Sequence, residues 1–124
     1  MSGWRSREIR SFRSACAGIA ETLRGERHMR FHLVSACIVA VLAIWLRIPR
    51  SDILWLLLAI AFVFTAELIN TAIERTVDRI SSDIHPLAKA AKDAAAGAVL
   101  VAVIFAAAVG AIVIGPPLWR VCFQ

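Results

Sequence analysis

The chain has 124 residues, of which 60% are hydrophobic, and it carries a formal net charge of +5 with a mean hydropathy of +0.73. This apolar share is well above that of water-soluble domains, so the composition excludes a soluble globular fold and predicts an all-α membrane protein. The length fits a single domain over residues 1–124, and the basic charge is better explained by anionic lipid and membrane topology than by a nucleic-acid partner.

Residues 5–24 are predicted to form an amphipathic helix that lies in the membrane surface. Apolar residues recur there at intervals of 3, 4, 3 and 4 and form one helical stripe beside a face of arginines. The stripe consists of Ile9, Phe12, Cys16, Ile19 and Leu23. A basic amphipathic helix of this kind binds along a membrane and does not cross it.

Three uncharged blocks follow, over residues 33–46, 53–66 and 94–119. Only the last exceeds the roughly 18 residues that identify a spanning helix by itself. We expect spanning segments over 31–49 and over 53–73, the second continuing as a helix to about residue 80. A third helix, containing the third span, is predicted over 86–115, because Pro86 suits a first helical turn. Its alanines and glycines permit close packing inside a bundle or oligomer.

The basic residues predict the orientation of these helices. Eleven of the 14 lie in residues 1–30 and 75–93, against three at positions 47, 50 and 120. The positive-inside rule therefore places the N-terminus and the 75–93 connection in the cytoplasm. No secretory signal sequence is expected, because a polar, arginine-rich stretch precedes the first apolar block. Cys16, Cys37 and Cys122 lack metal-site spacing and are interpreted as small apolar packing residues.

Glu67, Asn70, Glu74 and Asp78, here called the carboxylate stripe, fall on one face of the second spanning helix. A charged side chain at mid-bilayer costs about 2.5–3.5 kcal/mol on insertion scales, so such a stripe calls for a function or for partners. One interpretation is structural pairing with Arg27, Arg30, Lys89 or Lys92 of neighbouring helices. Another is a cation site at the inner membrane edge, because Mg²⁺ is bound by carboxylate oxygens together with substrate phosphates.

Further charged residues stand at the same predicted membrane face. Glu26 and Arg30 lie one turn apart at the entrance of the first span, and Lys92 and Asp93 lie at the entrance of the third. Acidic groups for a metal and basic groups for phosphate are what phosphoryl transfer requires. The sequence contains neither G-x-x-x-x-G-K-[ST] nor a protein-kinase signature, so a nucleotide would need a different scaffold.

Two other functions remain open at this point. A small cation transporter would use Glu67 and Glu74 to bind the translocated ion, and a non-enzymatic membrane scaffold would use its charges for structural pairs. The polar groups gather at one interface and do not continue toward Trp45 and Trp55. That placement favours an enzyme at the interface over a transport path.

Three segments then resemble a known family: ERHMRFHL from Glu26, ELINTAIE from Glu67 with Asp78 after it, and HPLAKAAKDAAAGAVL from His85. Over roughly residues 7–115 the chain resembles the prokaryotic diacylglycerol kinases, a family that also contains the undecaprenol kinases. The resemblance implies a homotrimeric lipid kinase of the bacterial inner membrane with three spanning helices and an N-terminal surface helix. Such an enzyme transfers the γ-phosphate of ATP, with Mg²⁺, to a lipid alcohol at the cytoplasmic interface.

The resemblance also implies site residues. Glu67 matches the general base and, with Arg30, the lipid-substrate site; Glu26 and Glu74 match metal ligands. The positions implied for ATP binding are Arg7, Glu26, Asn70, Glu74, Asp83, Ile84, His85, Lys92 and Asp93. His28 and His32 are expected to contact lipid headgroups.

The lipid substrate is predicted from the resemblance alone. ERHMRFHL, NTAIE with Thr71, and HPLAKAAKD look more like the undecaprenol kinase branch, which predicts phosphorylation of undecaprenol to undecaprenyl phosphate. The alternative is diacylglycerol kinase activity that makes phosphatidic acid.

Overall fold

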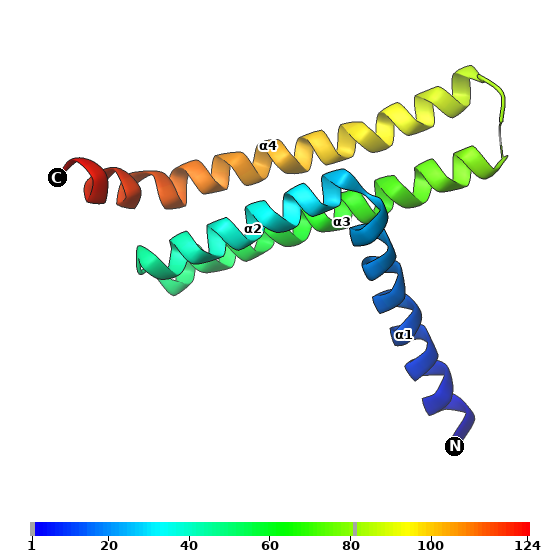
Figure 1. The fold of residues 1–124 in the computed structure, drawn as a ribbon, viewed down its shortest axis with the longest axis horizontal. Coiled ribbons are helices and arrows are strands. Elements are labelled where there is room, and N and C mark those ends of the chain that lie inside the picture. Colours follow the sequence, from blue (N-terminus) through cyan, green and yellow to red (C-terminus); the bar gives the residue numbers. More distant parts are fainter. Residues whose placement is uncertain (1, 81) are drawn as a thin grey trace.

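The computed structural model describes residues 2–80 and 82–124 and confirms an all-α chain. Its four helices are α1 (Ser2–Gly25), α2 (Arg27–Trp45), α3 (Arg50–Ile80) and α4 (Pro86–Phe123). Figure 1 shows α2, α3 and α4 running side by side, whereas α1 leaves this bundle at a steep angle near the start of α2. The predicted helix over 5–24 therefore begins three residues earlier and ends one residue later.

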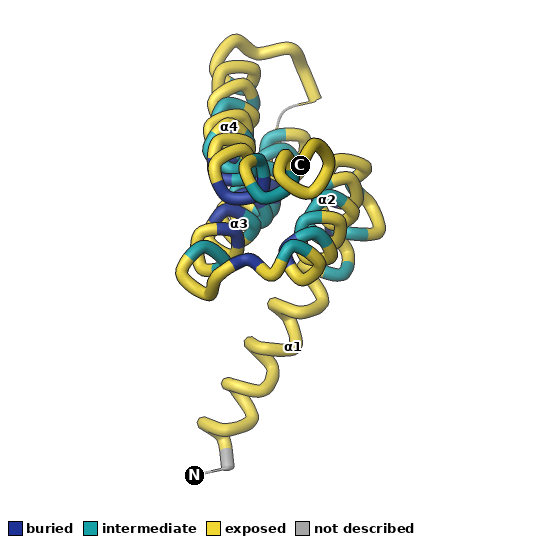
Figure 2. Tube along the Cα trace, turned by 90° about the vertical axis from the view of Figure 1, so that its left-hand side faces the viewer, coloured by how far each residue is buried: buried dark blue, intermediate teal, exposed yellow. Residues whose placement is uncertain are grey.

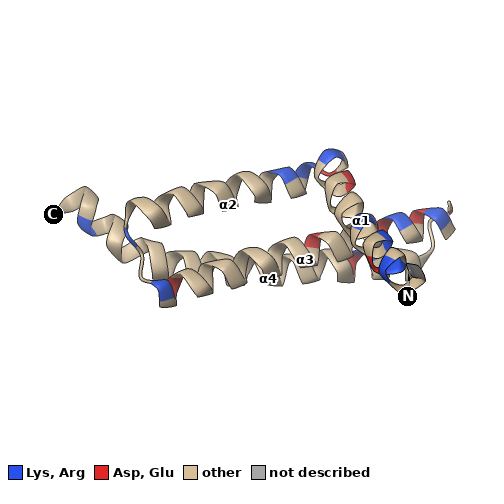
Figure 3. Ribbon diagram, turned by 90° about the horizontal axis from the view of Figure 1, so that it is seen from below, with Lys and Arg blue, Asp and Glu red and all other residues tan. Residues whose placement is uncertain are grey.

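The helices α2, α3 and α4 are each long and apolar enough to cross a membrane, so the chain is a multi-pass membrane protein. Figure 3 shows that Lys, Arg, Asp and Glu gather at the two ends of the bundle and leave the middle almost free of charge. The larger charged group lies at the end where α1 joins. This distribution matches two membrane interfaces separated by a hydrocarbon layer.

The turn between α2 and α3 explains why α2 ends at Trp45 and does not extend to residue 49 as predicted. Arg47 takes up a left-handed conformation with φ of 54°, and its N–H donates to the carbonyl of Ile44. The N–H of Ile48 donates to the carbonyl of Ala43. This pair of bonds is the Schellman arrangement that closes a helix, and Ile48 then packs into the core beside Ala43.

The buried residues lie along the faces on which α2, α3 and α4 meet, as Figure 2 shows. One cluster joins Ala43 and Ile48 near the end of α2 to Leu56 and Ala59 of α3 and to Val109, Val113 and Ile114 of α4. Small residues such as Ala59 (3% exposed) and Ala102 (fully buried) allow α3 and α4 to approach closely. Phe62 and Phe105 add an edge-to-face ring contact between the two helices, with centroids 6.0 Å apart.

Ala102→Leu is expected to destabilise the bundle by about 1–3 kcal/mol, because three extra carbon atoms would have to enter a filled helix interface. Reversible unfolding in mixed micelles measures the effect. Ala111→Leu is the matched control, since Ala111 is an exposed alanine of the same helix. Equal stability of Ala102→Leu and the wild-type chain would contradict the close α3–α4 packing.

The helix α4 continues to Phe123, eight residues past the predicted end at residue 115. Pro116 and Pro117 lie inside this extension, although proline lacks an N–H donor and commonly kinks or breaks a helix interior. Proline nevertheless has a nearly helical φ, and the backbone regains helical bonds afterwards, the last being Gln124 N–H to the Arg120 carbonyl. The Trp119 and Phe123 rings stack one turn apart with centroids 4.3 Å from each other.

All three cysteines are exposed in this chain. Cys16, Cys37 and Cys122 therefore do not fill the core of the bundle, contrary to the packing role predicted for them. The small apolar side chains of the core cluster are alanines and valines instead, namely Ala43, Ala59, Val109 and Val113.

Candidate active site

Glu67 is the buried acidic residue of the carboxylate stripe, with 5% of its surface exposed. Its Oε1 lies 3.1 Å from Nε2 of His32 in α2. A carboxylate has no donor, so the tautomer of His32 that pairs with carboxylate Glu67 is the one with its hydrogen on Nε2. Both side chains are shielded, at 15% and 7% exposure, and this hydrogen bond offsets part of the cost of burying a carboxylate in the membrane.

The next turn of α3 holds Asn70 and Glu74, linked by a hydrogen bond from Asn70 Nδ2 to Glu74 Oε1 over 3.3 Å. The other end of the Asn70 amide, Oδ1, is buried and accepts no hydrogen bond from any described residue. Buried acceptors are rarely left unpaired, because the lost hydration costs about 1–3 kcal/mol. The unpaired amide oxygen of Asn70, beside the carboxyl group of Glu74, can therefore accept a hydrogen bond from a ligand or bind a cation.

Arg75 forms an ion pair with Glu26 and thereby holds Glu26 near the part of α3 that contains Glu74. Its Nη2 lies 3.6 Å from Oε1 of Glu26 at the start of α2, and its Nη1 lies 3.0 Å from Oε1 of Glu21 in α1. Gly25 leaves room for this arginine, since a Cβ at that position would stand 3.3 Å from Nη2. Arg75 thus ties α1 and the start of α2 to α3, one residue after Glu74.

The end of α3 and the start of α4 carry a second group of charges. Lys92 donates to Oδ1 of Asp78 over 2.9 Å, and Lys89 forms an ion pair with Asp93. Lys92 precedes the uncharged block of α4, and its hydrogen bond with Asp78 is the main reason that the pKa of Lys92 lies above its ordinary value. The charge of Glu74 raises this pKa further, so the electrostatic influence of the carboxylate stripe extends to α4.

An open pocket of about 360 Å³, here called the loop pocket, lies between these two helices and their connection. Five of the residues predicted to bind ATP line it: Asp83, Ile84, His85, Lys92 and Asp93. His85 also caps α4, because its Nδ1 accepts the backbone N–H of Leu87 over 3.2 Å. The fold therefore gathers residues from the end of α3, the connection and the first two turns of α4 at one hollow.

Two predicted site residues lie elsewhere in this chain. Arg7 donates from Nε to the carbonyl of Gly3, and it belongs to the half of α1 that Figure 1 shows projecting away from the bundle. Arg30 donates to the carbonyl of Arg24 over 2.6 Å and points back toward α1. Neither side chain joins the carboxylate stripe or the loop pocket in the single chain.

Within residues 2–80 and 82–124, no three acidic, histidine or cysteine side chains converge as a complete metal site. Mg²⁺ does not need such a site, since it is typically held by one or two carboxylates, water and substrate phosphates. The Glu74 carboxylate, with the unpaired Oδ1 of Asn70 beside it, supplies oxygen donors of that kind. The residues present therefore fit a nucleotide-bound Mg²⁺.

The membrane bundle has a buried carboxyl group, oxygen atoms that suit Mg²⁺, and lysines beside the loop pocket. These features together are typical of one class of protein, the integral membrane enzymes that act at the lipid–water interface. The family model of the prokaryotic diacylglycerol kinases matches residues 13–114. The chain belongs to this family, and it is a lipid kinase.

Relatives agree with the family. The chain is 43% identical over 113 residues to the undecaprenol kinase of Bacillus subtilis, covering 91% of this chain and 92% of the relative. It is 40% identical over 109 residues to a diacylglycerol kinase of Synechocystis, covering 87% and 62% respectively. The diacylglycerol kinase of Escherichia coli K12 is 35% identical over 89 residues, covering 72% of this chain and 73% of that protein.

Sequence reasoning missed two contacts of the site. His32 was expected to contact headgroups, yet it lies against Glu67, and Arg75 was assigned no partner although it contacts Glu21 and Glu26. Of the structural ion pairs considered for the stripe, Asp78 with Lys92 is present. A signal for His32 existed, because it directly precedes the first uncharged block and thus stands at the depth of the membrane edge.

Proposed function

We propose that the protein phosphorylates undecaprenol to undecaprenyl phosphate with ATP and Mg²⁺ at the cytoplasmic membrane edge. The observation that carries this proposal is the buried carboxyl group of Glu67, which contacts His32 near the start of α2. The similarity to the Bacillus subtilis undecaprenol kinase along nearly the whole of both chains supports undecaprenol over diacylglycerol. Diacylglycerol remains the second candidate, because the other relatives cited are diacylglycerol kinases.

In the proposed reaction Glu67 takes the proton of the lipid hydroxyl as the general base. The lipid oxygen forms a bond to the γ-phosphorus of ATP, the bond from that phosphorus to the β–γ bridging oxygen breaks, and its electron pair leaves with ADP. Burial at the membrane edge suits this role, because the hydroxyl of a lipid alcohol arrives from the hydrocarbon side. Arg30 is proposed to meet the headgroup region of the lipid substrate.

The remaining predicted residues are proposed to hold the nucleotide. Lys92, Asp93, Asp83, Ile84 and His85 would hold ATP at the loop pocket that they line. Glu26 and Glu74 would hold Mg²⁺ with Asn70 beside them, and the metal would supply neutralisation of charge on the phosphate oxygens. Arg7 is proposed to reach ATP from α1, which requires an arrangement of α1 other than the single-chain one.

Topology and assembly are also proposals. The N-terminus and the connection between α3 and α4 would face the cytoplasm of a bacterial inner membrane, following the excess of basic residues there. The helix α1 would lie along the membrane surface, and the chain would act as a homotrimer. Apolar residues exposed on all three spanning helices, among them Ile38, Leu54 and Leu100, are compatible with both lipid and partner contacts.

The test is transfer of radiolabelled phosphate from ATP by the purified protein in mixed micelles with Mg²⁺. Undecaprenol, diacylglycerol and no lipid are offered in parallel, and the labelled products are separated. We expect label in undecaprenol at a rate at least about tenfold above diacylglycerol, a preference equivalent to about 1.4 kcal/mol. Faster labelling of diacylglycerol would show that diacylglycerol, and not undecaprenol, is the preferred substrate. Label in neither lipid would overturn the proposed reaction.

A further inference from the structure

His32 is a shielded polar residue to which the proposed reaction gives no role. It lies on α2, 35 positions from Glu67 in the sequence, and its Nε2 is 3.1 Å from Oε1 of that residue. The neighbouring Phe31 ring meets the imidazole edge-on, with centroids 5.7 Å apart. The imidazole of His32 therefore links α2 to the proposed base on α3.

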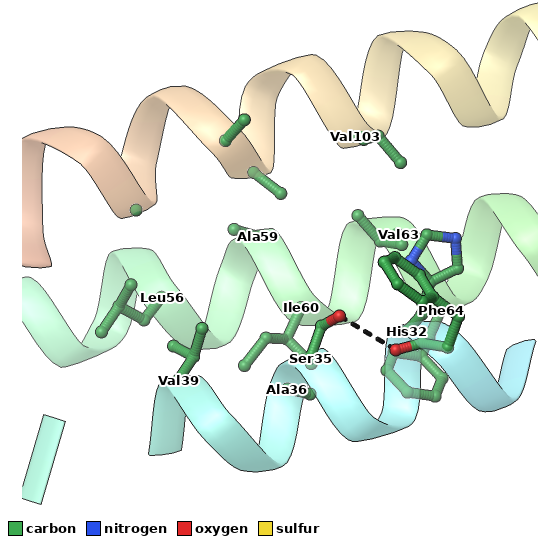
Figure 4. A pocket seen from close by; sticks show the side chains of 14 residues that line it. His32, Ser35, Ala36, Val39, Leu56, Ala59, Ile60, Val63, Phe64 and Val103 are labelled. Atoms are coloured by element: carbon green, nitrogen blue, oxygen red, sulfur yellow. Dashed lines mark hydrogen bonds between the residues drawn. The ribbon is translucent and has the colours of Figure 1, made fainter. Parts of the chain in front are cut away.

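His32 also lines an apolar pocket of about 230 Å³ between α2, α3 and α4. Figure 4 shows His32 and Phe64 toward one end of this pocket and Val39 and Leu56 toward the other. Apart from His32 and Ser35, its lining is hydrocarbon, aromatic or glycine. The imidazole therefore lies where an apolar pocket inside the membrane meets the proposed catalytic carboxylate.

We propose that His32 is a positioning residue for lipid phosphorylation, holding Oε1 of Glu67 so that Oε2 faces the hydroxyl of the lipid alcohol. This inference rests on the proposed function. A glutamate side chain has three rotatable bonds, and one hydrogen bond to a fixed imidazole removes much of that freedom before substrate arrives. With Oε1 engaged, Oε2 is the oxygen that remains to take the proton.

The chemistry of histidine suits this task better than that of a permanently charged partner. An arginine or lysine beside Glu67 would hold the carboxylate in its ionised form and oppose uptake of the substrate proton. A neutral imidazole donates one hydrogen bond without imposing a full charge. His32 can therefore orient Glu67 and still leave it able to act as a base.

Two substitutions separate this role from simple packing. His32→Phe keeps a ring of similar size but removes the donor, whereas His32→Gln keeps an N–H donor and cannot become charged. His28→Phe is the matched control, because His28 lies one helical turn earlier on α2 and is exposed. Unfolding of each variant in micelles shows whether a loss of activity follows a loss of stability.

In the transfer assay with undecaprenol, His32→Phe should lower kcat by about 10- to 100-fold, the range that loss of a hydrogen-bond partner costs where that partner orients a metal ligand. The KM for ATP should stay within about twofold, His32→Gln should recover most of the rate, and His28→Phe should match the wild-type chain. Full activity of His32→Phe, or equal losses in the Phe and Gln variants, would overturn the inference.

A second measurement reports the contact without turnover. The carboxylate infrared band of Glu67 is isolated by subtracting the spectrum of Glu67→Gln, and it should shift in His32→Phe but not in His28→Phe. An unchanged band in His32→Phe would overturn the inference whatever the activity. A shifted band in a protein that labels neither lipid would show that the proposed function, and with it the catalytic role of His32, is wrong.

Discussion

Replacing Glu67 by glutamine should lower kcat for lipid phosphorylation by about 100- to 10,000-fold, the range that a general base contributes. The substitution keeps the shape of the side chain, and the amide oxygen can still accept a hydrogen bond from His32 Nε2, in the place where Oε1 of Glu67 accepts it in the wild-type chain. It cannot take a proton from a lipid hydroxyl. The rate of label transfer from ATP to undecaprenol, at saturating ATP and Mg²⁺, measures the effect.

Glu8→Gln is the control for this loss, because Glu8 is an exposed carboxylate on α1 and should leave the rate unchanged. Thermal unfolding and gel filtration in the same detergent establish that Glu67→Gln remains folded and assembled. A folded Glu67→Gln protein with wild-type kcat would remove Glu67 from the reaction and return the carboxylate stripe to a structural or ion-binding role.

The second large effect is expected for Glu74→Gln, in the response to Mg²⁺. The substitution keeps an acceptor for Asn70 Nδ2, whose hydrogen bond with Glu74 is 3.3 Å long, but removes the charge that a divalent cation needs. Removing even an indirect partner of a metal ligand costs about 10- to 100-fold in affinity, so loss of a direct ligand should weaken apparent Mg²⁺ affinity by about 100-fold or more. Titration of kinase activity with Mg²⁺ at fixed ATP measures the shift.

Asp52→Asn provides the comparison for Glu74→Gln. Asp52 also lies on α3, but in its first turn at the opposite end of the helix, so its charge should not affect the Mg²⁺ titration. If Glu74→Gln reached half-maximal activity at the wild-type Mg²⁺ concentration, Glu74 would not be a metal ligand. Equal shifts in both variants would indicate a general effect of net charge.

Much of the fold follows from local pattern. Long uncharged blocks favour helices in a membrane, because a helix pairs its backbone N–H and C=O groups within one segment where hydrocarbon offers them no partner. The predicted spans over 31–49 and 53–73 differ from α2 and α3 mainly at the ends. At these ends local hydrogen bonds set the helix boundary. The Schellman bonds of Arg47 and Ile48, for example, end α2 earlier than predicted.

The carboxylate stripe was also visible in the sequence, because helical periodicity puts Glu67, Asn70 and Glu74 on one face. Periodicity does not say how deeply each residue is buried. In the structure Glu67 is buried and contacts His32 of α2, Asn70 keeps an unpaired buried oxygen, and Asp78 is exposed and paired with Lys92. Residues on one stripe therefore have different surroundings, which depend on the neighbouring helices.

The sequence by itself determined that this protein is a helical membrane protein with charges at one membrane edge, because hydrophobic length and helical spacing are local properties. Only the tertiary structure decided that His32 meets Glu67, that Arg75 contacts Glu21 and Glu26, and that residues of α3, α4 and their connection together line the loop pocket. These contacts join residues on different helices, such as Glu21 and Arg75, 54 positions apart. Their formation depends on how the helices rotate and approach one another, which follows from packing along their whole length.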